Sequence, residues 1–179
     1  VFLENGKIRC SVIGGVEAKG ICGSGIVDAV AVMVKAGILD ETGIINEEDH
    51  AFEGVITEAE EQPAFRLPGT QVVITQKDIR AVQLAKSAVC SGMLTLIEEA
   101  GMQPKDVKRL TIAGGFGAFI DVQSAQTIGL IPPGFAAKAV AVGNAAGTGA
   151  SMVLLSEEVR RSSEKLAKRA ETVELSSRP

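Results

Sequence analysis

The first part of the chain carries the apolar pattern of a short hairpin followed by a helix. Phe2-Leu3 and Ile8 to Ile13 predict two strands joined by a tight turn at Asn5-Gly6, a dipeptide typical of hairpins. After a loop, apolar side chains at helical spacing predict a helix from Ile26 to Ala36, and Gly37 is placed to end it.

The middle of the chain contains an acidic, weakly patterned stretch followed by the start of a long helix. The stretch Asp40 to Leu67 is acidic and weakly patterned, with Pro63 and Pro68 near its end, so we expect an exposed excursion with at most short strands. Thr75-Gln76-Lys77-Asp78 then resembles a capping box with Asp in place of the usual Glu. A long helix to about Ala100 is predicted to follow.

The second half alternates strands and helices. Strands are predicted over Arg109 to Ala113 and Lys138 to Val142, and Asp121 is placed to cap a short helix between them. A last helix is predicted from about Ala145 towards Val173, with a narrow apolar stripe seven residues apart. The alternation predicts an α/β fold, and since no linker is evident we expect a single domain over residues 1–179.

Composition narrows the class of protein. Hydrophobic residues make up 46% and charged residues 22% of the 179 residues, which is enough apolar material for a core. The net charge of −4 gives no reason to expect nucleic acid or an anionic membrane as partner. No apolar run approaches the roughly 18 residues of a membrane span. The chain starts at Val1, without Met and inside a predicted strand, so we expect the N-terminus to be a cut.

The cysteines and the single histidine do not indicate a metal site or a catalytic site. Cys10, Cys22 and Cys90 form no CxxC pair and have no nearby His, so we expect no metal site and a reducing, cytoplasmic location. Cys22 has the best claim to reactivity because it precedes a helix N-terminus. The single His50 stands in an acidic stretch and is expected to be solvated, so no catalytic residue is assigned.

Three glycine clusters are the main candidates for ligand contact. Gly114-Gly115-Phe116-Gly117 follows a predicted strand directly. In α/β sheets, ligands bind at the carboxyl ends of the strands. Asn144 opens a similar strand-to-helix turn, and Gly23-Ser24-Gly25 stands where Ser24 can cap a helix and free N–H groups could bind an anion. Tight turns and close helix packing explain the same glycines equally simply.

Four stretches, in order, resemble one known family. They are GICGSGIVDAV (20–30), ITQKDIRAVQLAK (74–86), IAGGFGAFID (112–121) and VGNAAG (142–147). They are similar to the C-terminal region of reductive activators of corrinoid proteins, and the resemblance covers nearly the whole chain, from about Gly20 to Ser176.

The resemblance implies an ASKHA fold, the ribonuclease H-like fold of actin, sugar kinases and heat-shock ATPases, with a mixed sheet and flanking helices. In that fold two subdomains close over ATP. The family implies ATP-dependent reduction of cob(II)alamin to cob(I)alamin in corrinoid methyltransferase systems, with the electron from a two-iron two-sulfur cluster in an N-terminal ferredoxin domain. It also implies a corrinoid protein as partner and a homodimer.

Carried over by position, Gly114, Gly115, Phe116 and Gly117 match the loop against adenosine. Gly23, Ser24, Gly25, Asn144 and Lys77 complete the expected nucleotide contacts. The chain departs from the family in having no Asp-x-Gly phosphate loop and no ferredoxin cysteines. We therefore expect residues 1–179 to be the C-terminal portion of the ASKHA domain, inactive alone, with Mg²⁺ held by the missing half of the site.

Two alternatives remain open from the sequence. The chain could be a non-catalytic dimerisation or corrinoid-protein docking module whose glycines serve packing alone. A small acyl- or sugar-kinase lobe would share the fold, but the match of residues 20–30 to the activators disfavours it.

Overall fold

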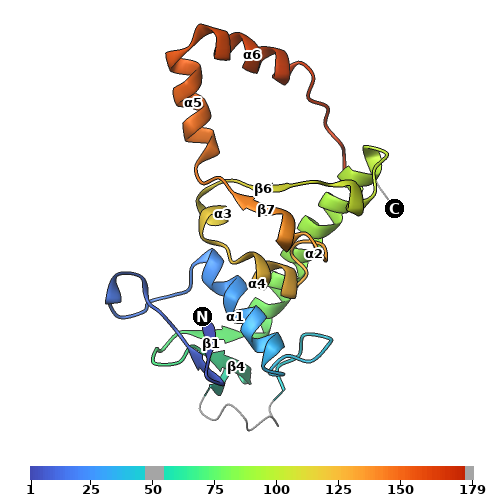
Figure 1. The fold of residues 1–179 in the computed structure, drawn as a ribbon. Coiled ribbons are helices and arrows are strands. Elements are labelled where there is room, and N and C mark those ends of the chain that lie inside the picture. The colour runs from blue at the N-terminus through green and yellow to red at the C-terminus, as the bar shows by residue number, and fades with distance from the viewer. Residues whose placement is uncertain (47–54, 176–179) are drawn as a thin grey trace. The chain divides into compact units, whose positions relative to one another are not determined.

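The computed structural model describes residues 1–46 and 55–175, and the chain divides into two compact units. The first comprises Val1–Cys90 and Ile120–Ala136, and the second comprises Ser91–Phe119 and Ala137–Pro179. Each unit is described by itself below, and Figure 1 labels the main elements. In chain order they are β1 (Phe2–Glu4), β2 (Lys7–Arg9), η1 (Ile13–Gly15), α1 (Gly23–Lys35), β3 (Ile56–Ala59), β4 (Gln62–Arg66), β5 (Val73–Thr75), α2 (Gln76–Glu99), η3 (Pro104–Asp106), β6 (Leu110–Ile112), α3 (Gly115–Phe119), α4 (Val122–Thr127), η4 (Ala136–Lys138), β7 (Ala139–Ala141), α5 (Ala145–Leu155) and α6 (Glu157–Ala167).

The first unit opens with the predicted hairpin. β1 and β2 pair antiparallel, and Asn5 and Gly6 both have left-handed backbone, with φ of 51° and 73°. Two consecutive left-handed residues match the right-handed twist of the strands, which is why Asn-Gly is favoured there. The second strand is shorter than predicted: it ends at Arg9, the residue that pairs with Phe2 at the start of β1. A 3₁₀ turn, η1, occupies residues 13–15.

Helix α1 supplies much of the core of the first unit. Five of its consecutive side chains are buried, from Ala29 to Met33, because alanines on its remaining faces let neighbouring segments approach. The helix ends as predicted. Gly37 is left-handed (φ 73°), and the N–H of Ile38 reaches back to the carbonyl of Met33 at 2.9 Å, which closes the last turn.

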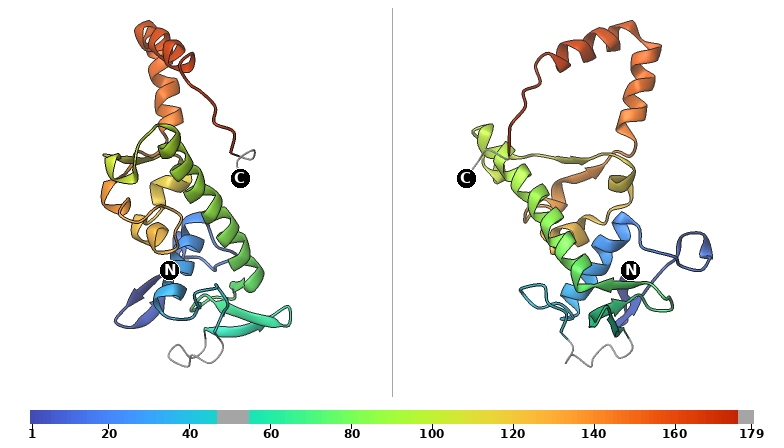
Figure 2. Two further views of the ribbon diagram at one scale, coloured as in Figure 1. Left: turned by 90° about the vertical axis from the view of Figure 1, so that its right-hand side faces the viewer. Right: turned by 180° about the vertical axis from the view of Figure 1, so that it is seen from behind.

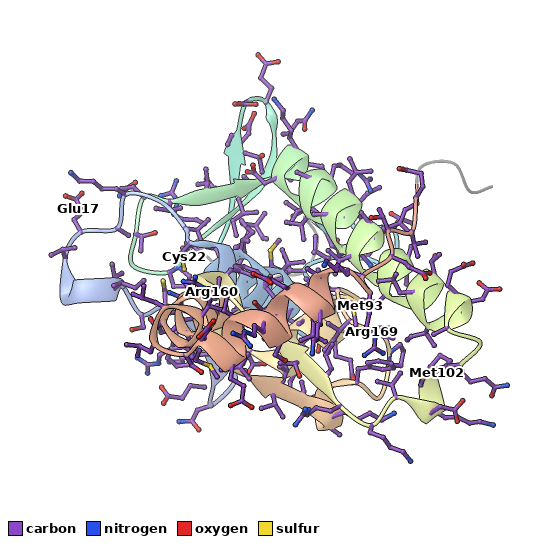
Figure 3. All side chains as sticks on the ribbon, turned by 90° about the horizontal axis from the view of Figure 1, so that it is seen from above. Glu17, Cys22, Met93, Met102, Arg160 and Arg169 are labelled. Carbon is purple, nitrogen blue, oxygen red and sulfur yellow. The ribbon has the colours of Figure 1, made fainter. Side chains whose placement is uncertain are left out.

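The start of α1 differs from the prediction. Ser24 was expected to cap the helix, but the cap is Cys22, whose Sγ accepts the N–H of Gly25 at 3.4 Å. Ser24 lies two residues past the cap, inside the first turn of the helix, and its Oγ lies 3.5 Å from the same sulfur. The Ser24 hydroxyl and then the Gly25 N–H lower the pKa of the Cys22 thiol. Figure 3 shows Cys22 beside the ribbon that leads into α1.

The acidic excursion is more ordered and more buried than the sequence indicated. β3, β4 and β5 form an antiparallel sheet, and within β4 the side chains of Ala64 and Phe65 are fully buried. Leu67 is also buried. The expected exposure was therefore wrong for Ala64, Phe65 and Leu67, whereas the strands β3 and β4 are short, as predicted, with four and five residues. The many acidic residues around it hid this short buried segment between Pro63 and Pro68, in which Arg66 interrupts the apolar side chains.

A tight turn at residues 40–45 is fixed to one face of α2. Asp40 Oδ1 accepts hydrogen bonds from the N–H groups of Thr42 and Ile44 and from the Thr42 hydroxyl, at 2.8–2.9 Å. Gln76 donates to the carbonyl of Gly43 at 2.7 Å and accepts the N–H of Ile45 at 3.0 Å. Arg80 and Gln83, one and two helical turns further along α2, also bind the segment 40–45. Both donate hydrogen bonds to the carbonyl of Thr42.

The predicted capping box begins α2. Asp78 Oδ2 accepts the N–H and the hydroxyl of Thr75, at 2.8 Å and 2.7 Å, and the N–H of Asp78 donates back to the Thr75 hydroxyl. Gly101 is left-handed just past the helix, as its place in the sequence predicts. Asp121 caps α4 by accepting the N–H of Ser124 at 2.7 Å.

The second unit is built on a parallel pair of strands. β6 and β7 pair over three residues, Leu110 with Ala139 through Ile112 with Ala141, and helices α3 and α5 follow the two strands. Parallel and antiparallel strand pairs thus occur in separate sheets among the described residues. The α/β fold class predicted from the order of elements is confirmed.

The predicted C-terminal helix is two helices. α5 and α6 meet at Ser156, which has extended backbone (φ −139°, ψ 120°) and caps α6 by accepting the N–H of Val159. Figure 2 shows the bend between them. Ser followed by Glu157 and Glu158 is a helix-start signal, and it overrode the seven-residue apolar spacing that suggested one helix. On the exposed face of α6, Glu157 and Arg161 form an i,i+4 ion pair at 2.6 Å.

Burial is unequally distributed between the units. The buried hydrophobic side chains of the described residues all belong to the first unit, with Phe65, Met33 and Ile38 among the largest fully buried ones. In the described part of the second unit, Gly117 is the one buried residue. No helix in the described ranges is long and apolar enough to cross a lipid bilayer.

Two glycines of one turn should respond oppositely to alanine. A Cβ at Gly117 would lie 2.5 Å from Cγ2 of Ile112, whereas a Cβ at Gly115 meets no atom within 4 Å. We expect Gly117→Ala to lower the free energy of unfolding by about 1–3 kcal/mol through overpacking, and Gly115→Ala to leave it unchanged or slightly higher. Urea unfolding followed by circular dichroism measures both; equal effects of the two substitutions would contradict this packing.

Cys22 should be the fastest-reacting thiol of the chain. It is exposed and its pKa is lowered, so a larger share is thiolate at neutral pH, whereas Cys10 and Cys90 are partly buried. With limiting iodoacetamide at pH 7, we expect peptide mass spectrometry to find label on Cys22 first, and Cys22→Ser to remove the fast phase. Faster labelling of Cys10 or Cys90 would show the thiolate assignment to be wrong.

Candidate functional site

The first glycine turn follows β6 directly and leaves its backbone uncovered. Gly114 has φ 98°, a conformation that favours glycine, and the N–H of Ala118 donates to its carbonyl at 3.0 Å to start α3. No atom lies within 4 Å of the position a Cβ would take at Gly114 or Gly115. The backbone here is open to a ligand at two successive residues.

Gly117 has a different role from its two neighbours. It is buried, and the close approach of Ile112 shows that its missing side chain lets α3 pack on the end of β6. Phe116, between them, is half exposed. Of the four predicted contacts in this turn, Gly114, Gly115 and Phe116 face open space and Gly117 serves packing.

The second glycine turn follows β7. Gly143 is left-handed (φ 62°), and Asn144 caps α5 by accepting the N–H of Gly147 at 3.0 Å, as predicted. A Cβ at Gly147 would lie 2.6 Å from the Asn144 amide nitrogen, so this glycine is required by the cap. This contact lies within the cap of α5 itself, so it does not test the prediction that small residues let the helix pack close to its neighbours.

The two turns lie side by side at the carboxyl end of the parallel pair. The N–H of Gly114 donates to the carbonyl of Gly143 at 2.8 Å, and the N–H of Val142 donates to the carbonyl of Ile112 at 2.9 Å. Gly114, Gly115, Phe116 and Asn144 are thus brought to one edge of the second unit, where α/β folds bind ligands.

The remaining predicted contacts belong to the first unit. Gly23, Ser24 and Gly25 form the first turn of α1, and Lys77 is exposed in the first turn of α2. The Gly25 N–H is already bonded to Cys22, which leaves the predicted anion site at this helix start with one donor fewer.

A cavity of about 790 Å³ lies against this helix start. Apolar side chains of the loop between β2 and α1 form much of its wall, together with Leu67, and both Cys10 and Cys22 line it. The sequence analysis missed this cavity because its wall is a loop of scattered apolar residues without strand or helix periodicity.

Metal ligands are not gathered anywhere in residues 1–46 and 55–175, where no group of three or more His, Cys, Asp or Glu side chains could hold an ion. His50, predicted to be solvated, lies outside the described residues. The four predicted contacts at the edge formed by the two glycine turns are backbone groups, the Phe116 ring and the Asn144 amide.

Known proteins with similar sequences share this architecture. Residues 2–179 match the family described as the C-terminal, ASKHA domain of RACo. The chain is 41% identical to the corrinoid activation enzyme RamQ of Eubacterium limosum, over 88% of the chain and 29% of that protein. It is 30% identical to the [Co(II) methylated amine-specific corrinoid protein] reductase of Methanosarcina barkeri, over 78% of the chain and 22% of that protein.

A solved structure agrees with these matches. The reductive activator for a corrinoid, iron–sulfur protein superposes on 97% of the chain with a TM-score of 0.82 at 30% sequence identity, and the match covers 30% of that structure. The chain thus spans less than a third of the length of these relatives. Since the family match runs through both compact units and nearly every residue, the chain belongs to the RACo family of corrinoid-protein reductive activators, as its C-terminal ASKHA domain.

Proposed function

We propose that residues 1–179 are the nucleotide-binding part of an ATP-dependent reductive activator that converts cob(II)alamin to cob(I)alamin in a corrinoid methyltransferase system. The observation that carries this proposal is the pair of glycine turns at the carboxyl ends of β6 and β7, joined by the Gly114–Gly143 hydrogen bond. Membership of the activator family and the names of the relatives support the general role.

The residues present fit the adenosine end of a nucleotide. Open backbone at Gly114 and Gly115 allows a flat base or a ribose to approach without a side chain in the way. The exposed ring of Phe116 offers an apolar surface beside them, and the Asn144 side chain stands at the neighbouring turn. Gly23, Ser24, Gly25 and Lys77 belong to the first unit and stay candidate contacts predicted from the sequence.

The phosphate end needs groups that this chain does not supply. Phosphoryl transfer depends on positioned metal ions and charge stabilisation, and the sequence has no Asp-x-Gly phosphate loop. We propose that Mg²⁺ and the phosphates are held by another part of the longer protein. A nucleotide closed between two parts would link ATP binding to a change of shape, and so to the uphill electron transfer.

The electron donor also lies elsewhere in this proposal. Four thiolates are needed for a two-iron two-sulfur cluster, and the chain has three cysteines. A cluster in the N-terminal part would supply one electron, and the residues described here would bind nucleotide and position the parts. The partner would be the corrinoid protein, in the cytoplasm, with the activator acting as a homodimer.

A second candidate function is a docking or dimerisation module without nucleotide. The exposed apolar side chains of the second unit, such as Phe119 and Leu155, favour it because exposed apolar groups commonly mark contact surfaces. The two functions are separated by titrating the longer protein with a fluorescent ADP analogue. Saturable binding supports the nucleotide site, and absence of binding supports the docking module.

Gly115→Val should weaken nucleotide binding without unfolding the protein. Gly115 has room for a side chain, so the fold tolerates valine, but the isopropyl group would occupy the space assigned to base or ribose. In the longer protein we expect the Kd for the ADP analogue to rise at least about tenfold, or 1.4 kcal/mol, with little change in Tm.

Gly149→Val is the matched control. Gly149 also has no atom within 4 Å of its Cβ position, but it lies within α5, beyond the turn. It should leave the Kd unchanged. An unaltered Kd for a folded Gly115→Val protein, or an equal loss in both variants, would remove Gly115 from the site.

The chain of residues 1–179 should release no phosphate from ATP by itself. Among the described residues no group of three or more His, Cys, Asp or Glu side chains could hold a metal ion, and the sequence lacks the Asp-x-Gly phosphate loop. A coupled phosphate assay on protein purified away from contaminating ATPases should give the rate of the buffer blank. Release above the blank that falls with Gly115→Val would mean that the chain holds a complete site.

A further inference from the structure

Two of the three cysteines line one cavity. Cys10 follows β2 and Cys22 caps α1, and both belong to the wall of the cavity of about 790 Å³ beside the start of that helix. Cys90 is not part of this wall. The cavity and its two thiols lie within the first unit. An open cavity with two thiols in its wall admits a thiol reagent to both of them.

The two thiols differ in reactivity. Cys22 is exposed, and the Ser24 hydroxyl and then the Gly25 N–H lower its pKa, which raises the share of thiolate at neutral pH. The thiolate is the form that attacks a disulfide. Cys10 is partly buried, and its Sγ lies 4.0 Å from the carbonyl of Ser11. Cys22 is therefore the thiol that reacts first with an incoming reagent, and Cys10 is the second thiol of the same wall.

The segment between the two cysteines is held by few contacts. Ile13 and Val16 are 82% and 67% exposed. A Cβ at Gly14, Gly15 or Gly20 would meet no atom within 4 Å. Figures 1 and 2 show this loop, in blue, extending away from α1. A disulfide needs its two Cα atoms about 4.4–6.8 Å apart, and a segment with few contacts can adjust to that distance.

We propose that Cys10 and Cys22 form a reversible disulfide when the protein meets a low-molecular-weight disulfide such as oxidised glutathione, and that this bond is a redox switch at the start of α1. In a reducing compartment, disulfides of this kind are transient and respond to the redox state. The inference does not rest on nucleotide binding, and its tests read covalent bonds and hydrogen exchange.

The reaction consists of two successive thiol–disulfide exchanges. The Cys22 thiolate attacks one sulfur of the small disulfide, so a mixed disulfide forms and one small thiolate leaves. The Cys10 thiolate then attacks the Cys22 sulfur, so the protein disulfide forms and the second small thiolate leaves. The pair of cysteines is oxidised, and the small disulfide is reduced to two thiols, which take up the two protons that the cysteines lose.

The bond would weaken the cap of α1. In the thiol form, Cys22 Sγ accepts the N–H of Gly25 at 3.4 Å. A sulfur bonded to Cys10 carries no negative charge and is drawn toward its new partner, so it accepts this N–H more weakly. We expect the Gly25 amide to exchange its hydrogen at least about threefold faster in the oxidised protein than in the reduced protein.

Trypsin separates the two thiols, so the bond can be identified directly. It cleaves after the basic residues that flank the cysteines, and Cys10 falls in the peptide 10–19 and Cys22 in the peptide 20–35. The reduced longer protein is treated with oxidised glutathione at neutral pH, quenched with acid, alkylated and digested. We expect mass spectrometry to find these two peptides joined in most of the protein, and dithiothreitol to separate them again.

Three variants separate the steps of the reaction. Cys10→Ser should stop it at the mixed disulfide, so glutathione stays on the peptide 20–35. Cys22→Ser should slow the oxidation of Cys10 at least about tenfold, because the attacking thiolate is lost. Cys90→Ser is the matched control and should leave the bond between Cys10 and Cys22 unchanged, since Cys90 lies outside the cavity wall.

Any of three results would overturn the inference. Cys22 of the unaltered protein could stay reduced or remain as the mixed disulfide, which would show that Cys10 does not reach it. The same treatment in urea could join the two peptides equally fast, which would show that the fold does not favour the pair. Finally, the Gly25 amide could exchange at the same rate in both redox states, which would show that the bond does not act on α1.

Discussion

The candidate site depends on one hydrogen-bonded register, the parallel pairing of β6 with β7. Because the strands are parallel, both end at the same edge, and the bond from the Gly114 N–H to the Gly143 carbonyl continues the ladder one step into the turns. Without that pairing the two glycine turns would be separate features of distant segments. With it, four of the residues assigned to nucleotide binding share one edge, and helices α3 and α5 begin beside them.

The local features were readable from the sequence because each rests on a few neighbouring residues. The Asn5-Gly6 turn, the Thr75–Asp78 capping box, the Asn144 cap and the Gly37 helix end all depend on side chains or backbone within five positions. Such short-range chemistry acts before any tertiary contact is made, so a sequence pattern is sufficient to place it. The α/β order followed from the same reasoning.

The errors arose where two signals competed or where distant contacts decided the outcome. At Ser156 a helix start overrode the apolar spacing that had suggested one helix. Phe65 is buried by the strands around it, which no local pattern announces amid acidic residues. At α1 the capping residue is Cys22 and not Ser24. The sequence analysis chose Ser24 because a thiol accepts an N–H less often than a hydroxyl does. In the glycine turn after β6, the sequence could not separate two different roles. Gly115 leaves the backbone open and Gly117 allows tight packing, but both are simply glycines in the sequence.

The turn at residues 40–45 has a consequence for how this family can diverge. Gln76, Arg80 and Gln83 bind the turn through its backbone carbonyls and one backbone N–H, so these contacts do not depend on the side chain of Glu41. Gly43 is the exception, because a Cβ there would collide with the Gln83 amide. The shape of the turn does depend on Asp40, whose carboxylate accepts three hydrogen bonds within it. Selection can therefore change the charge and identity of position 41, at the tip, as long as Asp40, Gly43 and the three side chains of α2 are kept.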